Sequence, residues 1–230
     1  RGEPAAAGAR AERPRGGGAA ALRESFAEVW RSATFRAICL QGLFGSSAWA
    51  ALPYLTLWLE LSCFANARAA AIYAGFTAGS ACGSLVGGAL LDAASRASPE
   101  RAPVWLAQLS VFAGIPGLAV VLYGLPPGRR APLFALVLFA MGSTMTWCQI
   151  INNTVFSAIM PPSRYDAVFA LDSVFEGVFG AIGSPAVGFI ADRYFGYSRD
   201  VSSCSPSDAN ARGSGLMIFC SATFTVAGVL

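Results

Sequence analysis

The sequence contains no histidine and no lysine, and only 13% of its 230 residues are charged. Without histidine, a Ser-His-Asp triad, a Cys-His pair and an HExxH zinc helix are excluded, and without lysine so are a Walker A loop and a Schiff-base nucleophile. We therefore expect no enzyme, no cofactor and no bound metal ion. The net charge of +3 is too small to indicate a nucleic-acid partner.

Apolar residues dominate what is present, at 55% of the chain. A membrane-spanning helix uses about 20 apolar residues, so this content is enough for six crossings with short polar connections. The fold class that we predict is an all-α, multi-pass integral membrane protein with a bundle of six transmembrane helices in the lipid bilayer. Each predicted span ends at charged residues, Pro or Gly, and the spans cover residues 37–59, 69–91, 104–125, 132–159, 167–191 and 215–230.

The first 36 residues differ from the bundle predicted for residues 37–230. Residues 1–21 are almost entirely Ala, Gly, Arg, Pro and Glu, which is typical of a disordered tail. Residues 22–36 combine apolar anchors with arginines and are expected to lie on the membrane surface. The chain begins with Arg1 rather than Met, which indicates a fragment or a processed product. Arginines near the spans divide equally between the two sides, so charge leaves the orientation open.

Small residues recur every four positions in two predicted spans. In the second span they form a glycine ladder, and in the fifth a weaker series is interrupted by Pro185, which is expected to kink the helix. Such stripes let two helix backbones approach closely in lipid, so we interpret them as helix-packing faces. The ladder is Gly75, Gly79, Gly83 and Gly87, and the weaker series is Gly180, Ser184 and Gly188.

Polar side chains inside predicted spans are costly and so indicate function or contacts between helices. Asp172 and Glu176 are four residues apart and share a helix face, with Glu176 near the bilayer midplane. An unpaired carboxylate there must be protonated or find a partner. Glu176 is therefore a candidate proton carrier, a structural carboxylate bonded to a neighbouring helix, or the partner of a group elsewhere in a larger protein. The other polar residues are Gln41, Gln108, Gln149, Asn152 and Asn153.

A nine-residue stretch at the end of the second span carries a recognisable motif. Gly88, Leu90, Asp92 and Arg96 match the loop signature G-x-L-x-D-x-x-x-R/K, although Ala93 stands where a basic residue is usual. The stretch resembles the gating loop of the major facilitator superfamily, a family of membrane transporters.

Further positions from residue 41 to residue 197 are similar to the second half of a plant and algal branch of that superfamily, with Ser173 and Ala48 departing from the pattern. They are Gln41, Gly42, Gly45, Trp49, Thr56, Gln108, Ser110, Gly114, Ile115, Pro116, Asn152, Asn153, Phe156, Ile159, Pro161, Ala170, Leu171, Asp172, Phe175, Glu176, Pro185, Gly188, Tyr194, Gly196 and Tyr197.

The resemblance implies that the six helices are helices seven to twelve of a twelve-helix transporter whose N-terminal six-helix half is missing, with residues 1–36 in the cytoplasmic loop. Helices seven, eight, ten and eleven would then line the path of a small-molecule solute. In that orientation Cys63 and Cys204 both face the non-cytoplasmic side, where a disulfide is possible. Path and coupling candidates are Gln41, Trp49, Asn152, Asn153, Asp172 and Glu176.

Two functions remain open at this point. The first is the C-terminal half of a secondary transporter that moves a small solute by alternating access, with proton coupling through Glu176 as one possible driving force. The second is a non-transporting receptor or assembly subunit that keeps the same fold. A third function, an intramembrane enzyme, would need a nucleophile, a base or a set of metal ligands, and the sequence offers no plausible set of these groups.

Overall fold

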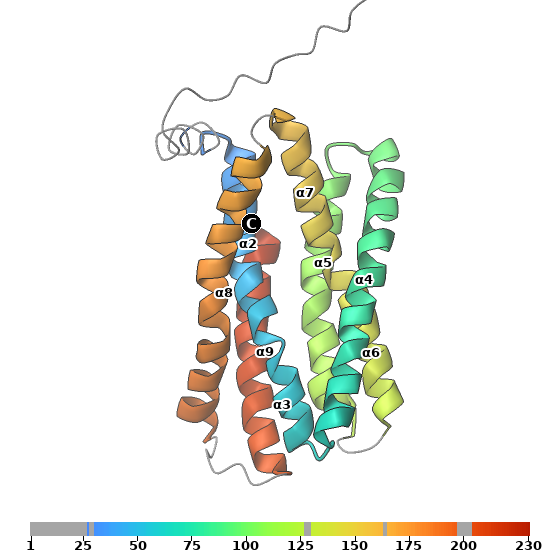
Figure 1. Cartoon of the computed structure of the whole chain (residues 1–230), viewed down its shortest axis with the longest axis vertical. Coiled ribbons are helices and arrows are strands. Elements are labelled where there is room, and N and C mark those ends of the chain that lie inside the picture. The colour runs from blue at the N-terminus through green and yellow to red at the C-terminus, as the bar shows by residue number, and fades with distance from the viewer. Residues whose placement is uncertain (1–26, 28–29, 127–129, 163–164, 197–203) are drawn as a thin grey trace, which may run out of the picture.

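The computed structural model describes Ala27 and residues 30–126, 130–162, 165–196 and 204–230. Within these residues every regular element is a helix (Figure 1). The tail expected over residues 1–21 lies outside the described part of the chain. The elements are α2 (Ala33–Ala51), α3 (Tyr54–Leu61), α4 (Asn66–Ala97), α5 (Ala102–Ala119), the π-helix η1 (Val120–Gly124), α6 (Ala131–Met145), α7 (Trp147–Ile159), α8 (Tyr165–Phe195) and α9 (Pro206–Val229).

Among the described residues, five segments are long and apolar enough to cross a membrane, by length and composition. They overlap the second to sixth predicted spans. The first predicted span, residues 37–59, is instead divided into α2 and α3 by Leu52 and Pro53, and neither piece is among the five. Proline has no N–H to donate, so the hydrogen-bond ladder of α2 stops there. The five segments are Asn66–Ala97, Ala102–Gly124, Ala131–Ile159, Val168–Phe195 and Pro206–Val229.

The predicted fourth span is a single apolar run, but its helix breaks at Thr146, between α6 and α7. A break leaves backbone groups without partners inside the helix. Here the buried Ser110 of α5 is the partner of these groups. Its hydroxyl oxygen lies 2.7 Å from the Thr144 carbonyl and 3.0 Å from the Met145 carbonyl. The same oxygen accepts from the Cys148 N–H at 3.1 Å. A side chain from another helix thus stabilises the break.

The helices form two groups that lie side by side (Figure 1). One contains α2, α3, α8 and α9, and the other contains α4, α5, α6 and α7. The groups meet where α5 packs on α9 and where α3 packs on α4. Because α2 and α3 follow one another along the length of the bundle, they together run beside α8 and α9 in the manner of one long broken helix.

The glycine ladder of α4 faces α6 and the first residue of α7. A Cβ added at Gly75 would lie 2.8 Å from the Ala135 carbonyl oxygen, and one at Gly87 would lie 2.7 Å from Cδ1 of Trp147. A Cβ added at Gly79 or Gly83 would lie still closer to a backbone carbonyl oxygen, that of Phe139 or Ser143 respectively. The partner advances by four residues for each four-residue step, so α4 and α6 run parallel with their backbones in close contact.

The weaker series on α8 faces α2 and α3. The Ser184 hydroxyl donates to the Ala50 carbonyl at 2.8 Å, which satisfies one of the last carbonyls of α2 before its break. Across the same contact the Ser47 hydroxyl donates to the Phe179 carbonyl at 3.0 Å. Gly188 lies 3.8 Å, measured from an added Cβ, from the Tyr54 hydroxyl. Helix α8 continues through Pro185 without a break in its helical assignment.

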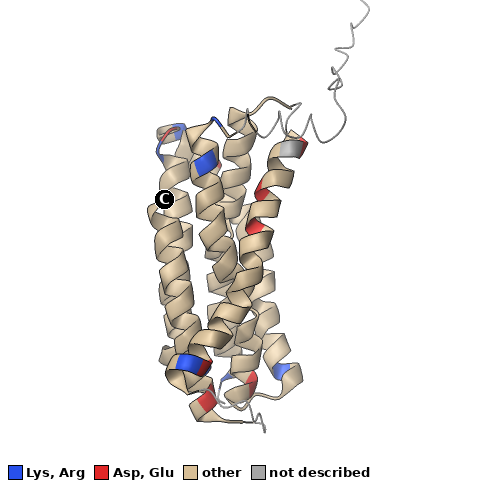
Figure 2. Cartoon of the chain, turned by 90° about the vertical axis from the view of Figure 1, so that its left-hand side faces the viewer, with Lys and Arg blue, Asp and Glu red and all other residues tan. Residues whose placement is uncertain are grey.

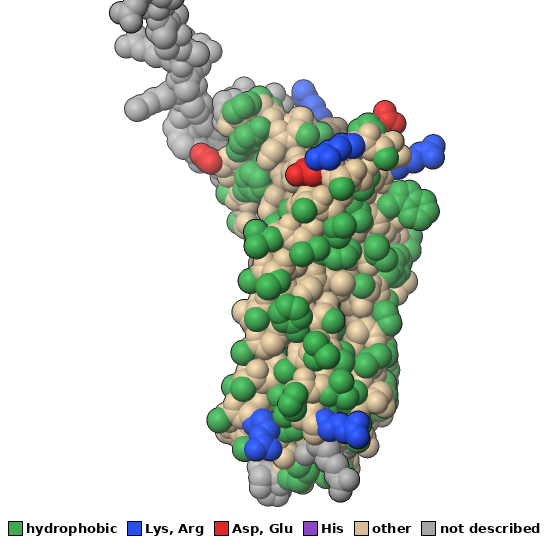
Figure 3. Space-filling view, turned by 90° about the vertical axis from the view of Figure 1, so that its right-hand side faces the viewer, with side chains coloured by type: hydrophobic (Ala, Val, Ile, Leu, Met, Phe, Trp, Pro, Cys, Tyr) green, Lys and Arg blue, Asp and Glu red, His purple; other side chains and the backbone are tan. Residues whose placement is uncertain are grey.

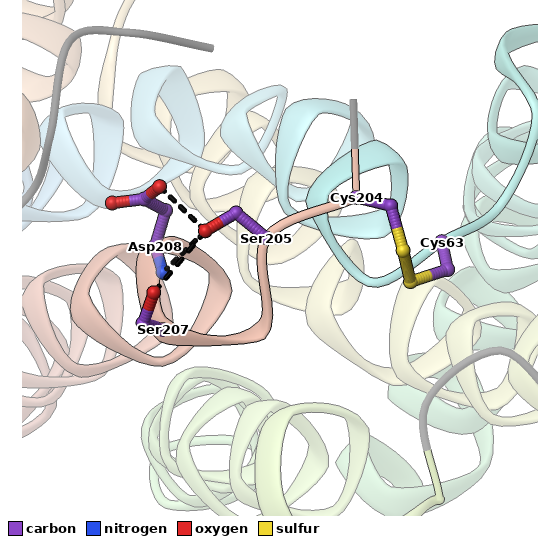
Figure 4. The surroundings of a disulfide bond; sticks show 5 residues. All are labelled: Cys63, Cys204, Ser205, Ser207 and Asp208. Carbon is purple, nitrogen blue, oxygen red and sulfur yellow. Dashed lines mark hydrogen bonds between the residues drawn. A yellow bond between two sulfur atoms is a disulfide. The ribbon is translucent and has the colours of Figure 1, made fainter. Parts of the chain in front are cut away.

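A disulfide joins the end of α3 to the start of α9. Cys63 and Cys204 are bonded with their Cα atoms 4.6 Å apart, so the disulfide that the sequence left open is formed (Figure 4). Directly after it, Ser205 caps α9 by accepting from the Asp208 N–H at 3.4 Å. The cap sets the start of α9 at Pro206, nine residues before the start predicted at 215, and places Asp208 and Arg212 inside the helix.

The G-x-L-x-D-x-x-x-R/K stretch lies on a helix rather than in a loop. Helix α4 continues to Ala97, so Gly88, Asp92 and Arg96 all fall within its last turns. Asp92 and Arg96 are exposed, and a Cβ on Gly88 would meet nothing within 4 Å. Only residues 98–101 remain to connect α4 with α5.

The segment expected on the membrane surface, residues 22–36, is described only in part. Ser32 caps α2 by accepting from the Phe35 N–H at 3.3 Å, so residues 33–36 belong to the helix. Phe35 is fully buried, and its ring lies 5.4 Å from that of Phe156. Phe35 therefore packs inside the bundle, whereas Ala33, Thr34 and Arg36 beside it are exposed.

The outer surface is apolar between two charged ends. Large hydrophobic side chains point outward along the bundle, among them Leu85 (79% exposed) and Trp105 (71% exposed). Charged positions gather at the two ends, except for acidic positions partway along one helix (Figure 2). On the face formed by α4 and α6, hydrophobic side chains likewise cover the middle, and charged ones stand at both ends (Figure 3). This pattern is typical of a surface that contacts lipid.

Candidate functional site

A cavity of about 590 Å³ lies between α2, α5, α6, α7, α8 and α9. Its size is that of a small-molecule site. No residue of α4 is among those lining it, although the resemblance placed that helix on the path. The polar lining residues are Gln41, Ser46, Trp49, Ser110, Cys148, Gln149, Asn152, Ser173 and Glu176.

One wall of the cavity is a hydrogen-bonded cluster of neutral side chains. Asn152 of α7 donates from Nδ2 to Oε1 of Gln41 on α2 at 3.1 Å. The Cys148 thiol, one turn earlier on α7, donates to the same oxygen at 3.6 Å. The cluster joins α2 of one helix group to α7 of the other, so this wall includes donors and acceptors that hold one another in position.

The carboxylate of Glu176 on α8 also lines the cavity. An added Cβ on Gly42 of α2 would lie 2.8 Å from its Oε1, so the carboxylate occupies space that only glycine leaves open. Glu176 is half-buried and lines the cavity. Burial in an apolar bundle makes the charged form of a carboxylate costly unless water or a bound group solvates it. The cavity is where such solvation can occur.

Asp172 lies one turn from Glu176 but outside the cavity lining. It is only 6% exposed, and its Oδ1 accepts from the Cys39 thiol at 3.6 Å. The contact lies between α8 and α2. Asp172 therefore lies between two helices, whereas Glu176 lines the cavity.

The structure brings together four of the six path candidates: Gln41, Trp49, Asn152 and Glu176 all line the cavity. Asn153 and Asp172 do not. Cys148 also lines the cavity but is not among the residues predicted from the sequence. Its position four residues before Asn152, on the same face of one helix, was the available signal.

The described residues contain no group of three His, Cys, Asp or Glu side chains that could hold a metal ion. What the cavity offers is hydrogen bonding by amides, hydroxyls and a thiol, an indole ring from Trp49 and one carboxylate. These groups suit reversible binding of a polar solute. They include no paired nucleophile and base.

No protein-family model matches the chain, and no curated protein matches it. The similarity to the major facilitator superfamily therefore remains a prediction from the residues that carry it.

Proposed function

We propose that this chain is a six-helix membrane bundle that forms the C-terminal half of a secondary transporter and moves a small polar solute. The observation that carries the proposal is the cavity of about 590 Å³, which is lined by amides, hydroxyls and one carboxylate inside an otherwise apolar bundle. Polar groups at that depth are costly and are retained where they serve a path for solutes or protons.

The proposal requires a sixth crossing, which α2 and α3 would make together. At about 1.5 Å per residue the two helices and their junction extend roughly 40 Å, enough for the hydrocarbon core. The break is compatible with lipid because Ser184 satisfies the Ala50 carbonyl near it. Broken helices of this kind are tolerated in membranes where neighbouring helices supply the missing hydrogen bonds.

The disulfide supports one orientation of the bundle. Disulfides persist on the oxidising side of a membrane and are rare in the cytosol. The end that carries Cys63 and Cys204 would therefore be non-cytoplasmic, with the amino-terminal end of α2 on the cytoplasmic side. This is the orientation that the family resemblance implies.

Alternating access requires a second bundle against which this one can rock. The cavity would then be half of a path between two bundles, the second being the N-terminal half that the resemblance implies. Glu176 would bind either a cationic solute or a proton that moves with a neutral one, because it is the only carboxylate among the residues lining the cavity.

A labelling experiment tests whether the cavity holds water within a membrane. Protein in lipid vesicles is treated with the anionic thiol reagent sulfonatoethyl methanethiosulfonate and analysed by peptide mass spectrometry. We expect a cysteine introduced at Ser173, an exposed residue of the cavity lining, to react, and Cys82 to be protected by lipid because it lies exposed on the outside of α4. Faster labelling of Cys82 than of the cysteine at position 173 would contradict the membrane placement.

A transport experiment tests the function itself. The protein together with its second bundle is reconstituted in vesicles, and uptake of radiolabelled sugars, amino acids and organic cations is followed with and without a proton gradient. We expect uptake of one class to respond to the gradient, and Glu176→Gln to abolish that response while solute exchange persists. The matched control is Asp166→Asn, an exposed acid in the first turn of α8.

The outcomes separate the two functions. An unchanged gradient response in Glu176→Gln would remove the coupling role but leave transport standing. Folded, reconstituted protein that moves none of these solutes would contradict the transporter and favour the receptor or assembly subunit.

A further inference from the structure

Helix α8 carries a second acid that the proposed function does not use. Asp172 is 6% exposed and lies outside the lining of the polar cavity, one turn before Glu176 on the same helix. Side chains four residues apart on a helix are neighbours, so one carboxyl group lies at the cavity and the other lies behind it. A solute in the cavity meets Glu176 but not Asp172, whereas a proton needs only the short step between them.

The described residues offer Asp172 little that would stabilise a negative charge. Its hydrogen-bond donor among them is the Cys39 thiol of α2, which is 3.6 Å from Oδ1 and is a weak donor. An ionised carboxylate has room for about four hydrogen bonds. In the described part of the chain no arginine pairs with Asp172, and α7 and α9, which also pack on α8, present no titratable group to it.

The surroundings of Asp172 are apolar, and its one charged neighbour among the described residues has the same sign. Cys39 belongs to a buried cluster with Phe156 and Val168, and Val168 lies one turn before Asp172 on α8. Burial among such groups makes a charged carboxylate costly. The charged neighbour is Glu176, and two ionised carboxylates one turn apart in an apolar bundle repel each other. The pair therefore avoids most of this cost when it holds one proton.

We propose that Asp172 and Glu176 form a two-site relay that holds a single proton. The proton rests on Asp172 while Glu176 is ionised at the cavity, and it moves to Glu176 as Asp172 becomes the carboxylate, so the net charge of the pair does not change. The relay makes Glu176 a site for a proton rather than for a cationic solute, because a cation has no use for a second acid that it cannot touch. The role of the relay in transport rests on the function proposed above, whereas the binding of a proton at Asp172 does not.

The place of Asp172 along α8 gives the relay a direction. Asp172 lies two turns after Tyr165, where the helix begins, which is roughly 10 Å along its axis. Glu176 lies one turn further in, at the cavity. In the orientation that the disulfide supports, the start of α8 is at the cytoplasmic end (Figure 1). Asp172 therefore lies between the cavity and the cytoplasm.

Infrared spectroscopy detects the proton directly. A protonated carboxyl group has a carbonyl stretching band above the amide I band, and this band shifts in D₂O. Spectra are recorded at neutral pH from the whole protein in lipid nanodiscs. We expect a band that Asp172→Asn removes. Asp166→Asn is the matched control, because it changes an exposed acid in the first turn of α8, and it should leave the band unchanged.

Cys39→Ala assigns the band to this site without changing either acid. A carbonyl group that loses a hydrogen bond vibrates at a higher frequency, so the band should move upward when the thiol that contacts Asp172 is removed. Cys82→Ala removes an exposed thiol from α4 and should leave the band in place.

Transport tests whether the proton moves. The protein and its second bundle are reconstituted in vesicles, and uptake driven by a proton gradient is compared with solute exchange in the absence of a gradient. We expect Asp172→Asn to lower gradient-driven uptake by about tenfold or more and to leave exchange nearly unchanged, because the solute does not touch this side chain. A residue that only holds α2 against α8 would affect both rates together.

The possible results separate the relay from the transport function. The absence of the infrared band, or a band that Asp172→Asn does not change, would overturn the binding of a proton at Asp172. A gradient response that survives Asp172→Asn, or uptake and exchange that fall together, would overturn the relay. Protein that shows the band but moves no solute would contradict the transporter and the relay with it, while the proton-binding site would stand.

Discussion

Two helix pairs in this bundle are built from small residues, and they use them differently. Between α4 and α6 the ladder places backbone against backbone, so that any added side chain would meet a carbonyl group or the Trp147 ring. Between α2 and α8 the contact combines a close approach at Gly183 with serine hydroxyls that bond across it. Next to that second contact, Gly42 leaves room for a carboxylate.

The difference matches the position of the polar cavity. No residue of α4 lines it, whereas α2 and α8 supply Gln41, Trp49 and Glu176. A backbone carbonyl cannot move without its helix, but the end of a glutamate side chain can rotate. The α4–α6 ladder therefore fixes two helix backbones against each other, whereas at Gly42 the α2–α8 pair contains a side-chain end that can turn.

The largest expected effect is that of Gly83→Ala on the fixed pair. The new Cβ would overlap the Ser143 carbonyl, and neither helix can move alone because the ladder continues on both sides. We expect a loss of about 2–3 kcal/mol, or roughly 5–10 °C in Tm. The measurement is thermal unfolding of detergent-solubilised protein, followed by tryptophan fluorescence.

The control for this substitution lies on the same helix. Gly88→Ala adds a Cβ that meets nothing within 4 Å and should raise helix stability slightly. Equal losses of Tm in the two variants would mean that glycine flexibility in α4, rather than contact with α6, determines stability.

Ser184→Ala tests the hydrogen bonds of the second pair and should have a smaller effect. It leaves the Ala50 carbonyl at the end of α2 without its 2.8 Å donor, which costs about 1 kcal/mol, or roughly 2–4 °C in Tm. Ser84→Ala, whose hydroxyl bonds within its own helix, should change Tm little. If both variants unfold at the wild-type temperature, the α2–α8 contact depends on packing alone.

The apolar runs of the sequence predicted five of the long helices, but some of the predicted helix ends were wrong. Each predicted span ended at the first charged residue, whereas α4 continues through Asp92 and Arg96, and α9 begins before Asp208 and Arg212. Charged side chains at helix ends reach the aqueous boundary while the backbone remains helical. Spans predicted from side-chain polarity alone are therefore shorter than the helices, whose backbone hydrogen bonds continue past the first charged residue.

The break at Thr146 could not be predicted from its own segment. Residues 132–159 contain no proline or glycine at that point, and the break is stabilised by Ser110 of another helix. The cavity was predicted better, because polar residues in spans are few: Gln41, Asn152 and Glu176 follow from sequence alone. Asn153 and Asp172 share the same chemistry, and only the three-dimensional structure separates them from the lining.

The smallest expected effect on stability is that of Gly42→Ala. Its Cβ would lie 2.8 Å from Oε1 of Glu176, but this is the end of a flexible side chain beside a cavity, so the carboxylate can turn away. We expect the unfolding free energy to change by less than about 0.5 kcal/mol, because the gain in helix propensity offsets the free-energy cost of moving the Glu176 side chain. The displaced carboxylate should instead change, by about twofold, the rate at which an anionic thiol reagent labels a cysteine introduced at Ser173, because the charge within the cavity moves. Gly45→Ala, on the same helix and also lining the cavity, meets nothing within 4 Å and should leave the labelling rate unchanged. A loss of stability as large as that of Gly83→Ala would show that Glu176 is held as rigidly as a backbone carbonyl, and the contrast between the two helix pairs would no longer hold.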